Sequence, residues 1–229
     1  PGANANAVAE LVFGMVVTAS RNFWDGTSGW ELRGKVLALY GFGAVGRNVA
    51  RIAKGFGMTV VAGDPFLTED QIKAPVGENP GADKAVFCKV GDTPADVTPE
   101  LLGQLFDGAS VVSLHVPATE KTKGSINGDL IRKMAKKGCL VNTARKEVVD
   151  EVSLEAAMKE CEKISYVCDV GLSTDIQKNL GEKRIFTTAK KMGAQTAEAN
   201  DNAGAMAATQ IAQHKSGDAA CQRCIVNRA

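Results

Sequence analysis

The chain has 229 residues, of which 45% are hydrophobic, 23% charged and 5% aromatic. This composition is typical of a globular protein and excludes a disordered, collagen-like or low-complexity chain. Lys and Arg number 27 and Asp and Glu number 26, so the sequence predicts neither a nucleic acid nor an anionic membrane as a partner.

Segments with strand and helix character alternate along the chain, which is typical of an α/β fold with a parallel sheet and crossover helices. In chain order, the expected helices cover residues 4–20, 45–55, 99–106, 128–134, 151–161 and 196–213. The expected strands cover residues 36–40, 58–62, 110–115, 139–143, 164–169 and 184–188. Between residues 66 and 99 prolines and charges weaken the pattern, so we expect mostly loop there, with one short strand at 85–90.

The most apolar run, residues 7–19, contains Glu10 and is too short to span a bilayer. No basic region precedes it, so it is not predicted to be a signal peptide. The six cysteines lie among apolar neighbours and predict reduced thiols in a cytoplasmic protein: Cys88, Cys139, Cys161, Cys168, Cys221 and Cys224. The last two form a lone CxxC with no second pair or adjacent His, so no metal site is predicted.

A glycine motif, Gly41-Phe42-Gly43-Ala44-Val45-Gly46, directly follows the strand expected at 36–40 and opens the next helix. Its glycines allow a tight turn, close approach of a pyrophosphate and close packing of helix on strand. The N-terminus of the helix offers N–H groups and a positive dipole end to that anion, and Arg47 adds a charge beside it.

Asp64 completes this fingerprint, because it lies 18 residues past Gly46 at the end of the next expected strand. A carboxylate there accepts hydrogen bonds from the adenosine ribose hydroxyls and repels a 2′-phosphate. The sequence therefore predicts a Rossmann-type doubly wound domain that binds NAD rather than NADP.

Five stretches together resemble the D-isomer-specific 2-hydroxyacid dehydrogenase family: residues 1–11, 32–35, 115–119, 141–145 and 193–199. Their order and spacing agree with the family over nearly the whole chain. Within the family, the chain is most similar to short D-3-phosphoglycerate dehydrogenases, a subset of which has Lys in place of the usual catalytic His.

The resemblance implies a subunit of two lobes. Residues 1–194 would form the NAD-binding domain, and residues 195–229 the last helix and tail of a substrate lobe. Most of that lobe would precede Pro1, so we expect the chain to be a fragment. The resemblance also implies a homodimer, with the opening helix as the contact, although the apolar stripe of this helix is equally compatible with ordinary core.

The resemblance assigns catalytic roles to Arg145 and Lys191. Arg145 follows the strand expected at 139–143, where a guanidinium can hold a carboxylate or keto oxygen through two hydrogen bonds. Lys191 occupies the position of the family's general acid/base His. As a base it needs a pKa well below about 10.4, and the charges of Arg145, Lys190 and the nicotinamide would lower it.

The family also places a Glu five residues past the Asp at position 169. This chain has Thr174 there and Asp175 one place later, so Asp175 is the third catalytic candidate. The absence of that Glu is compatible with a lysine base, because a nearby carboxylate would raise the pKa of the ammonium group.

The remaining cofactor residues also come from the resemblance. They are His115, Val116, Pro117, Thr143, Ala144, Arg145, Asp169, Gly193 and Ala194, with Asp169 near the nicotinamide carboxamide. A buried core position for His115 stays open as the alternative. Lys183, Arg184, Lys190 and Lys191 cluster in the sequence and would suit a phosphate on the substrate.

The function implied is NAD-dependent oxidation of D-3-phosphoglycerate to 3-phosphohydroxypyruvate, the first step of serine biosynthesis. Two alternatives stay open. One is a hydroxypyruvate or glyoxylate reductase of the same family, and the other is a non-catalytic NAD(H)-sensing binding protein.

Overall fold

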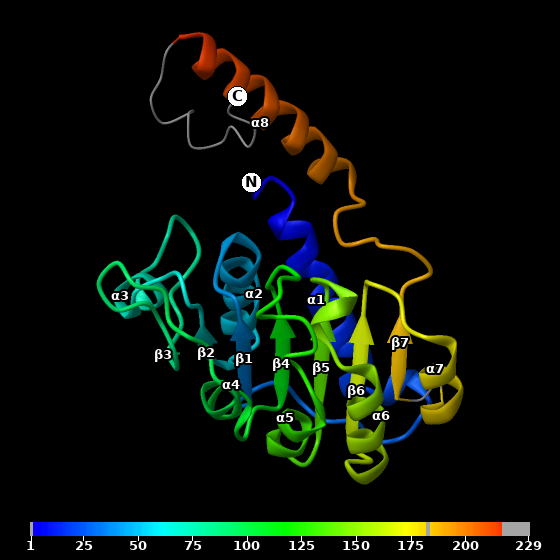
Figure 1. Ribbon diagram of the computed structural model, residues 1–229. Coiled ribbons are helices and arrows are strands. Elements are labelled where there is room, and N and C mark those ends of the chain that lie inside the picture. The colour runs from blue at the N-terminus through cyan, green and yellow to red at the C-terminus, as the bar shows by residue number, and fades with distance from the viewer. Residues whose placement is uncertain (1, 182–183, 217–229) are drawn as a thin grey trace.

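The computed structural model describes residues 2–181 and 184–216 (Figure 1). Lys183 and the cysteine pair at 221 and 224 lie outside the described residues, as does the end of the tail. Among the residues described, no helix combines the length and the apolar character needed to cross a bilayer.

The described chain forms a seven-stranded sheet in the order β3-β2-β1-β4-β5-β6-β7, and every ladder is parallel. The strands are β1 Val36–Tyr40, β2 Thr59–Gly63, β3 Lys84–Ala85, β4 Val111–Leu114, β5 Gly138–Asn142, β6 Ile164–Cys168 and β7 Ile185–Thr187. The order reverses between β1 and β4, which creates a crevice at the carboxyl ends of these strands. The predicted doubly wound α/β fold is confirmed.

Helices cover both faces of the sheet. They are α1 Ala5–Ser20, α2 Ala44–Gly55, α3 Glu69–Lys73, α4 Pro99–Phe106, α5 Gly128–Lys133, α6 Glu151–Glu160, α7 Thr174–Leu180 and α8 Ala197–Lys215, with 3₁₀ turns at Asn22–Trp24 and Lys146–Val148. Successive strand residues point to opposite faces. In β1, Leu37 and Leu39 therefore pack with α1 and α2, whereas Ala38 and Tyr40 pack with α4, α5 and α6.

The expectation of loop between residues 66 and 99 was wrong for α3, and α7 was not expected either. In α3, Thr68 Oγ1 accepts from Gln71 N and Gln71 Oε1 accepts from Thr68 N, a capping box that starts a helix of five residues. Each short helix buries one isoleucine, Ile72 in α3 and Ile176 in α7, so neither shows a helical repeat in the sequence. The strand expected at 85–90 is only Lys84–Ala85.

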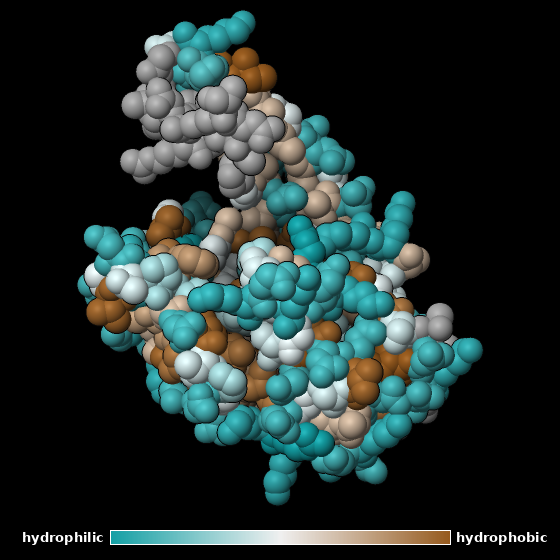
Figure 2. All heavy atoms as spheres, viewed as in Figure 1, coloured by the Kyte–Doolittle hydropathy of each residue, from teal (hydrophilic) through white to brown (hydrophobic). Residues whose placement is uncertain are grey.

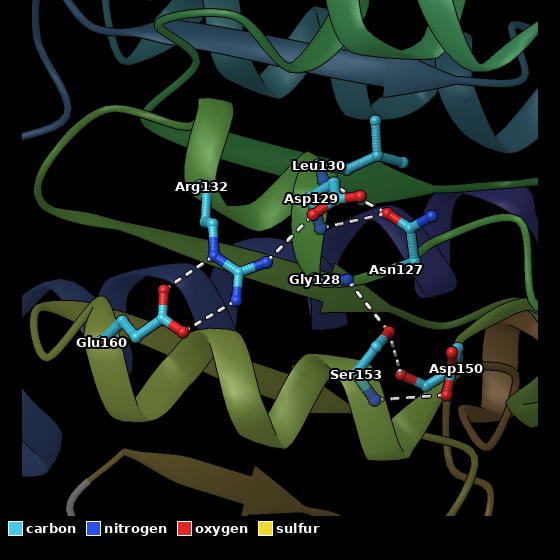
Figure 3. Close-up of polar contacts among 8 residues, drawn as sticks. All are labelled: Asn127, Gly128, Asp129, Leu130, Arg132, Asp150, Ser153 and Glu160. Atoms are coloured by element: carbon cyan, nitrogen blue, oxygen red, sulfur yellow. Dashed lines mark hydrogen bonds and ion pairs between the residues drawn. The ribbon is translucent and has the colours of Figure 1, made fainter.

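The contacts between α5 and α6 are shown in Figure 3. Asn127 and Asp150 each accept two main-chain N–H bonds from the first turn of α5 and α6, respectively. The exposed Arg132 guanidinium donates to both carboxylate oxygens of Glu160, at 2.7 and 2.8 Å. Each cap begins its own helix, and the two helices are joined by this ion pair and by Gly128 N, which donates to Ser153 Oγ at 3.0 Å.

The last helix, α8, extends beyond the carboxyl edge of the sheet and stands clear of the body (Figures 1 and 2). Ala199 is the one residue of α8 that is buried in the described structure, and Ile211 is 60% exposed. Thr196 Oγ1 caps the helix by accepting from Ala199 N at 3.0 Å. The segment expected as a helix over 196–213 is thus helical but makes few contacts with the rest of the chain.

Candidate active site

The glycine turn between β1 and α2 has the geometry that its sequence predicts. Gly41 has φ +93°, and a Cβ added to it would lie 2.6 Å from the carbonyl oxygen of His115. A Cβ on Gly46 would lie 2.4 Å from the carbonyl oxygen of Gly41. A Cβ on Gly43 would meet no non-neighbouring atom of the described residues within 4 Å, so the turn is open on that side. Because no described side chain caps α2, its first N–H groups face that opening.

Asp64 lies directly after β2 and is held by the main chain. Its Oδ2 accepts from Phe42 N at 2.8 Å within the glycine turn, and its Oδ1 accepts from Phe66 N at 2.9 Å. A carboxylate has about four acceptor sites, so these two bonds orient Asp64 and leave capacity for two hydroxyl groups.

Arg47 contacts the glycine turn through Phe42 and is also bonded to the chain of α3, so its role as an added charge beside a bound anion stays a prediction. Its guanidinium donates to the carbonyl oxygens of Gln71 at 2.5 Å and Ala74 at 3.2 Å. It also lies 4.8 Å from the centre of the Phe42 ring. The arginine therefore joins α2 to α3.

A cavity of about 510 Å³ opens at the carboxyl ends of β4, β5 and β6, beside the glycine turn. It is lined by Asn4, Val8, Val45, His115, Val116, Pro117, Thr143, Ala144, Arg145, Asp169, Lys191, Gly193, Ala194 and Gln195. Apart from Asn4, Val8 and Gln195, all were predicted to be site residues. The fold brings them together because the carboxyl ends of parallel strands meet at one edge.

Two buried polar atoms of this cavity wall have no hydrogen-bond partner among the described residues. They are His115 Nε2, after β4, and Thr143 Oγ1, after β5. Burial lowers the pKa of His115 to about 4, so the imidazole is neutral and can donate or accept. Buried polar groups are ordinarily satisfied, so these atoms, together with the open side of Gly43, fit a polar ligand such as a dinucleotide.

Lys191 and Arg145 meet at the edge of the cavity. Lys191 Nζ donates to the carbonyl oxygen of Ala144 at 3.1 Å and to that of Thr143 at 3.5 Å. Arg145 Nη1 donates to the same Ala144 carbonyl at 2.8 Å. Burial, and then the Arg145 charge, lower the pKa of Lys191, whereas Asp169 opposes this effect.

Asp169 holds the loop that carries Lys191. It is 1% exposed, and its Oδ1 accepts from Thr188 Oγ1 at 2.6 Å and from Met192 N at 2.7 Å. Its Oδ2 accepts from Gly193 N at 2.7 Å. These bonds lie on both sides of Lys191 in the sequence, so the carboxylate fixes that loop against the end of β6.

A second cavity of about 530 Å³ lies on the other side of the Arg145–Lys191 wall. Its lining includes four cationic residues and one carboxylate: Arg145, Lys146, Lys190, Lys191 and Glu147. The balance of these charges favours an anionic ligand.

Two predicted residues lie elsewhere. The Arg184 guanidinium donates to the carbonyl oxygens of Cys161 and Ile164, at the start of β6, so its proposed place near the substrate phosphate was wrong. β7 separates Arg184 from Lys190, and the two ends of a strand lie at opposite edges of the sheet. Asp175 is exposed in the first turn of α7 and lines neither cavity.

Sequence reasoning missed three lining residues and two buried ones. Asn4 and Val8 lie at the start of α1, and Gln195 follows the Gly193 turn. Asn142 and Tyr166 lie beneath the Arg145 loop. The first three fall within stretches that carry the family resemblance, whereas nothing in the sequence pairs Asn142 with Tyr166.

The fold and site define a dinucleotide-binding domain with a cationic pair, Arg145 and Lys191, at the carboxyl edge of its sheet. Residues 12–189 match the family model for the D-isomer specific 2-hydroxyacid dehydrogenase, NAD binding domain, and the chain belongs to this family. It is 29% identical over 231 residues to D-3-phosphoglycerate dehydrogenase of Bacillus subtilis (strain 168), covering 95% of this chain and 40% of that protein.

Two further comparisons agree with this family. Hydroxypyruvate reductase of Thermotoga maritima is 31% identical, over 89% of this chain and 65% of that protein. The crystal structure of NAD⁺-bound 3-phosphoglycerate dehydrogenase of Entamoeba histolytica superposes with a TM-score of 0.76 at 36% identity, covering 94% of this chain and 63% of that chain. The chain thus spans about two fifths to two thirds of these relatives.

Proposed function

We propose that the protein is an NAD-dependent D-2-hydroxyacid dehydrogenase that oxidises D-3-phosphoglycerate to 3-phosphohydroxypyruvate, the first step of serine biosynthesis. The observation that carries the proposal is the Arg145–Lys191 pair, which shares the Ala144 carbonyl at the edge of the main cavity. An anchor for a carboxylate and a group that can take a proton are thereby held side by side, next to the glycine turn.

Each side chain has a distinct task in this reaction. Arg145 binds the substrate carboxylate through its guanidinium and orients the carbon that bears the hydroxyl group. Lys191, in its neutral form, takes the hydroxyl proton as the carbon–oxygen bond becomes a carbonyl. Bound NAD supplies the acceptor for the hydride that leaves the same carbon. The lowered pKa of Lys191 supports the role of a base, because it increases the neutral fraction near neutral pH.

Two observations support a phosphorylated substrate. Lys146 and Lys190 add positive charge beside Arg145 and Lys191 in the second cavity, where a phosphate attached to the bound acid would find cationic partners. The similarity to D-3-phosphoglycerate dehydrogenases covers 95% of the chain in the Bacillus subtilis relative.

A reductase acting on hydroxypyruvate or glyoxylate is the second candidate, favoured by the similarity to the Thermotoga maritima hydroxypyruvate reductase. The same residues would serve it in reverse, with the Lys191 ammonium group giving its proton to the carbonyl oxygen. A non-catalytic NAD(H)-sensing protein is the remaining candidate, which the Lys at position 191 and the exposed position of Asp175 favour.

The test uses the full-length protein with NAD and D-3-phosphoglycerate, and with NADH and hydroxypyruvate or glyoxylate. We expect NADH formation that Lys191→Met lowers at least a hundredfold, whereas Lys178→Met on the exposed side of α7 leaves it unchanged. Activity with the unphosphorylated oxo acids alone would favour the reductase. Tight NAD binding without turnover of any of these substrates would identify the binding protein.

The same proposal assigns residues 1–194 to the NAD-binding domain and residues 195–229 to a substrate lobe. The exposed surface of α8 supports this division, because a helix with one buried residue is suited to pack against another lobe.

A homodimer in the cytoplasm completes the proposal. The apolar stripe of α1 packs in the core and gives the dimer no support, so light scattering is its test. The free thiols of Cys88, Cys139, Cys161 and Cys168 support a reducing compartment.

A further inference from the structure

A buried amide lies directly beneath the loop that carries Arg145. Asn142 is the last residue of β5 and is completely buried. Its Oδ1 accepts from Ala144 N at 3.0 Å, and its Nδ2 donates to the carbonyl oxygen of Arg145 at 2.9 Å. One side chain therefore closes residues 142–145 into a tight turn.

Tyr166 on β6 holds this amide in place from below. Asn142 Nδ2 donates its second hydrogen bond to Tyr166 Oη at 3.3 Å, and the tyrosine is 1% exposed. Both N–H groups of the amide and its oxygen thus have partners, which specifies a single orientation for the side chain in a dry environment.

The turn closed by Asn142 sets both cationic groups of the site. Its Thr143 and Ala144 carbonyl oxygens are the acceptors of Lys191 Nζ, and the Ala144 carbonyl also accepts from Arg145 Nη1. Asn142 bonds the peptide units on either side of the one whose Ala144 carbonyl accepts from both Lys191 and Arg145, and the first of these units also carries the Thr143 carbonyl that Lys191 contacts. Asn142 itself does not line the cavity, so it acts through these two residues.

We propose that Asn142, braced by Tyr166, is a positioning residue that sets the geometry of Arg145 and Lys191 for proton and hydride transfer. This inference rests on the proposed function. Loss of the amide leaves Ala144 N and the Arg145 carbonyl without their partners, and the turn relaxes. A displacement of about 1 Å in a catalytic group can lower the rate about a hundredfold.

The test compares three variants of the full-length protein with matched burial. Asn142→Ala should lower kcat about ten- to a hundredfold, with the KM for NAD within twofold of wild type. Tyr166→Phe removes one hydroxyl group and leaves the other two amide bonds, so it should lower kcat about threefold. Val141→Ala is the control: it is also completely buried on β5 but faces α1, so it should lower the melting temperature and leave kcat within twofold.

A purely structural role for Asn142 predicts a different pattern, in which Asn142→Ala lowers the melting temperature as Val141→Ala does and retains wild-type kcat per folded molecule. A double variant adds a second check. Because Asn142 acts through Lys191 and Arg145, adding Asn142→Ala to Lys191→Met should lower kcat less than threefold further. Wild-type kcat in Asn142→Ala, or full additivity with Lys191→Met, overturns the proposal. Should Asn142→Ala fail to fold, Asn142→Ser, which keeps an acceptor for Ala144 N, takes its place.

Binding of oxalate to the NADH-loaded protein separates this inference from the proposed function. Oxalate offers a carboxylate to Arg145 without any turnover, and calorimetry measures its affinity. If the wild-type protein turns over the hydroxy acid and Asn142→Ala has the same kcat, the positioning role alone is refuted. Oxalate binding that depends on Asn142, without turnover of any hydroxy acid, refutes the proposed function alone. Absence of both turnover and oxalate binding refutes the two together.

Discussion

The glycine turn offers a sharp test, because two of its glycines should fail for different reasons when replaced by alanine. Gly46→Ala puts a Cβ 2.4 Å from the Gly41 carbonyl oxygen, a main-chain atom that cannot rotate away. Overpacking of this kind costs about 1–3 kcal/mol. In a domain of this size, about 1 kcal/mol shifts the melting temperature by about 2–4 °C, so we expect a loss of roughly 2–12 °C.

Gly43→Ala should behave in the opposite way. Its φ of −74° and ψ of −158° are accessible to alanine, and the added Cβ meets no non-neighbouring atom of the described residues within 4 Å. The lower chain entropy of unfolded alanine offsets its poorer capping, so stability should change by less than about 1 kcal/mol. The methyl group instead occupies the side from which a pyrophosphate approaches, and NAD affinity should fall about ten- to a hundredfold, or about 1.4–2.8 kcal/mol.

Circular dichroism gives the two melting temperatures, and calorimetry gives NAD affinity at a temperature where both variants are folded. The reasoning is refuted if Gly43→Ala loses stability while it retains wild-type affinity. It is also refuted if Gly46→Ala has the same melting temperature as the wild type.

Three further predictions concern charge. Asp64→Asn removes the negative charge and leaves one oxygen to accept from either Phe42 N or Phe66 N, since an amide nitrogen cannot accept. It should weaken NAD binding about tenfold and narrow the preference for NAD over NADP, and an unchanged preference in calorimetry contradicts the role of Asp64. Because burial and Arg145 lower the pKa of Lys191, kcat/KM for oxidation should rise with pH and level off below pH 10.5, and an ascending limb that survives in Lys191→Met contradicts the lysine base. The unfolded chain binds a proton on His115 below pH 6.5, whereas the folded chain does so only below about pH 4. The free energy of unfolding, measured in urea, should therefore decrease by about 3 kcal/mol as the pH falls from 6.5 to about 4. His115→Gln should remove this dependence on pH.

Short-range patterns carried most of the fold. Apolar runs such as 36–40 and 110–115 predict buried strands because hydrophobic spacing is a local property, and the observed β1 and β4 agree within one residue. The exceptions are the short helices. α3 and α7 each bury one isoleucine, which gives no repeat to detect. α3 begins with a side-chain capping box, whereas the N-cap residue of α7 makes no side-chain cap bond and this helix ends at Gly181 with φ +75°.

Sequence proximity was a poor guide to the site wherever a strand or helix intervened. Arg184 and Lys190 are six residues apart, yet β7 carries them to opposite edges of the sheet. Asn142 and Tyr166 are 24 residues apart, and only the pairing of β5 with β6 brings their side chains together.

The sequence by itself determined the alternation of strands and helices, the glycine turn, the acidic residue after β2 and the Arg and Lys at the site, because each depends on local spacing or on a motif. The tertiary structure alone decided which charges face the cavity and how they are held. The shared Ala144 carbonyl, the Asp169 bonds to the Lys191 loop and the Asn142–Tyr166 brace all join segments from different strands. Such contacts follow from sheet order and register, which no local stretch of residues encodes.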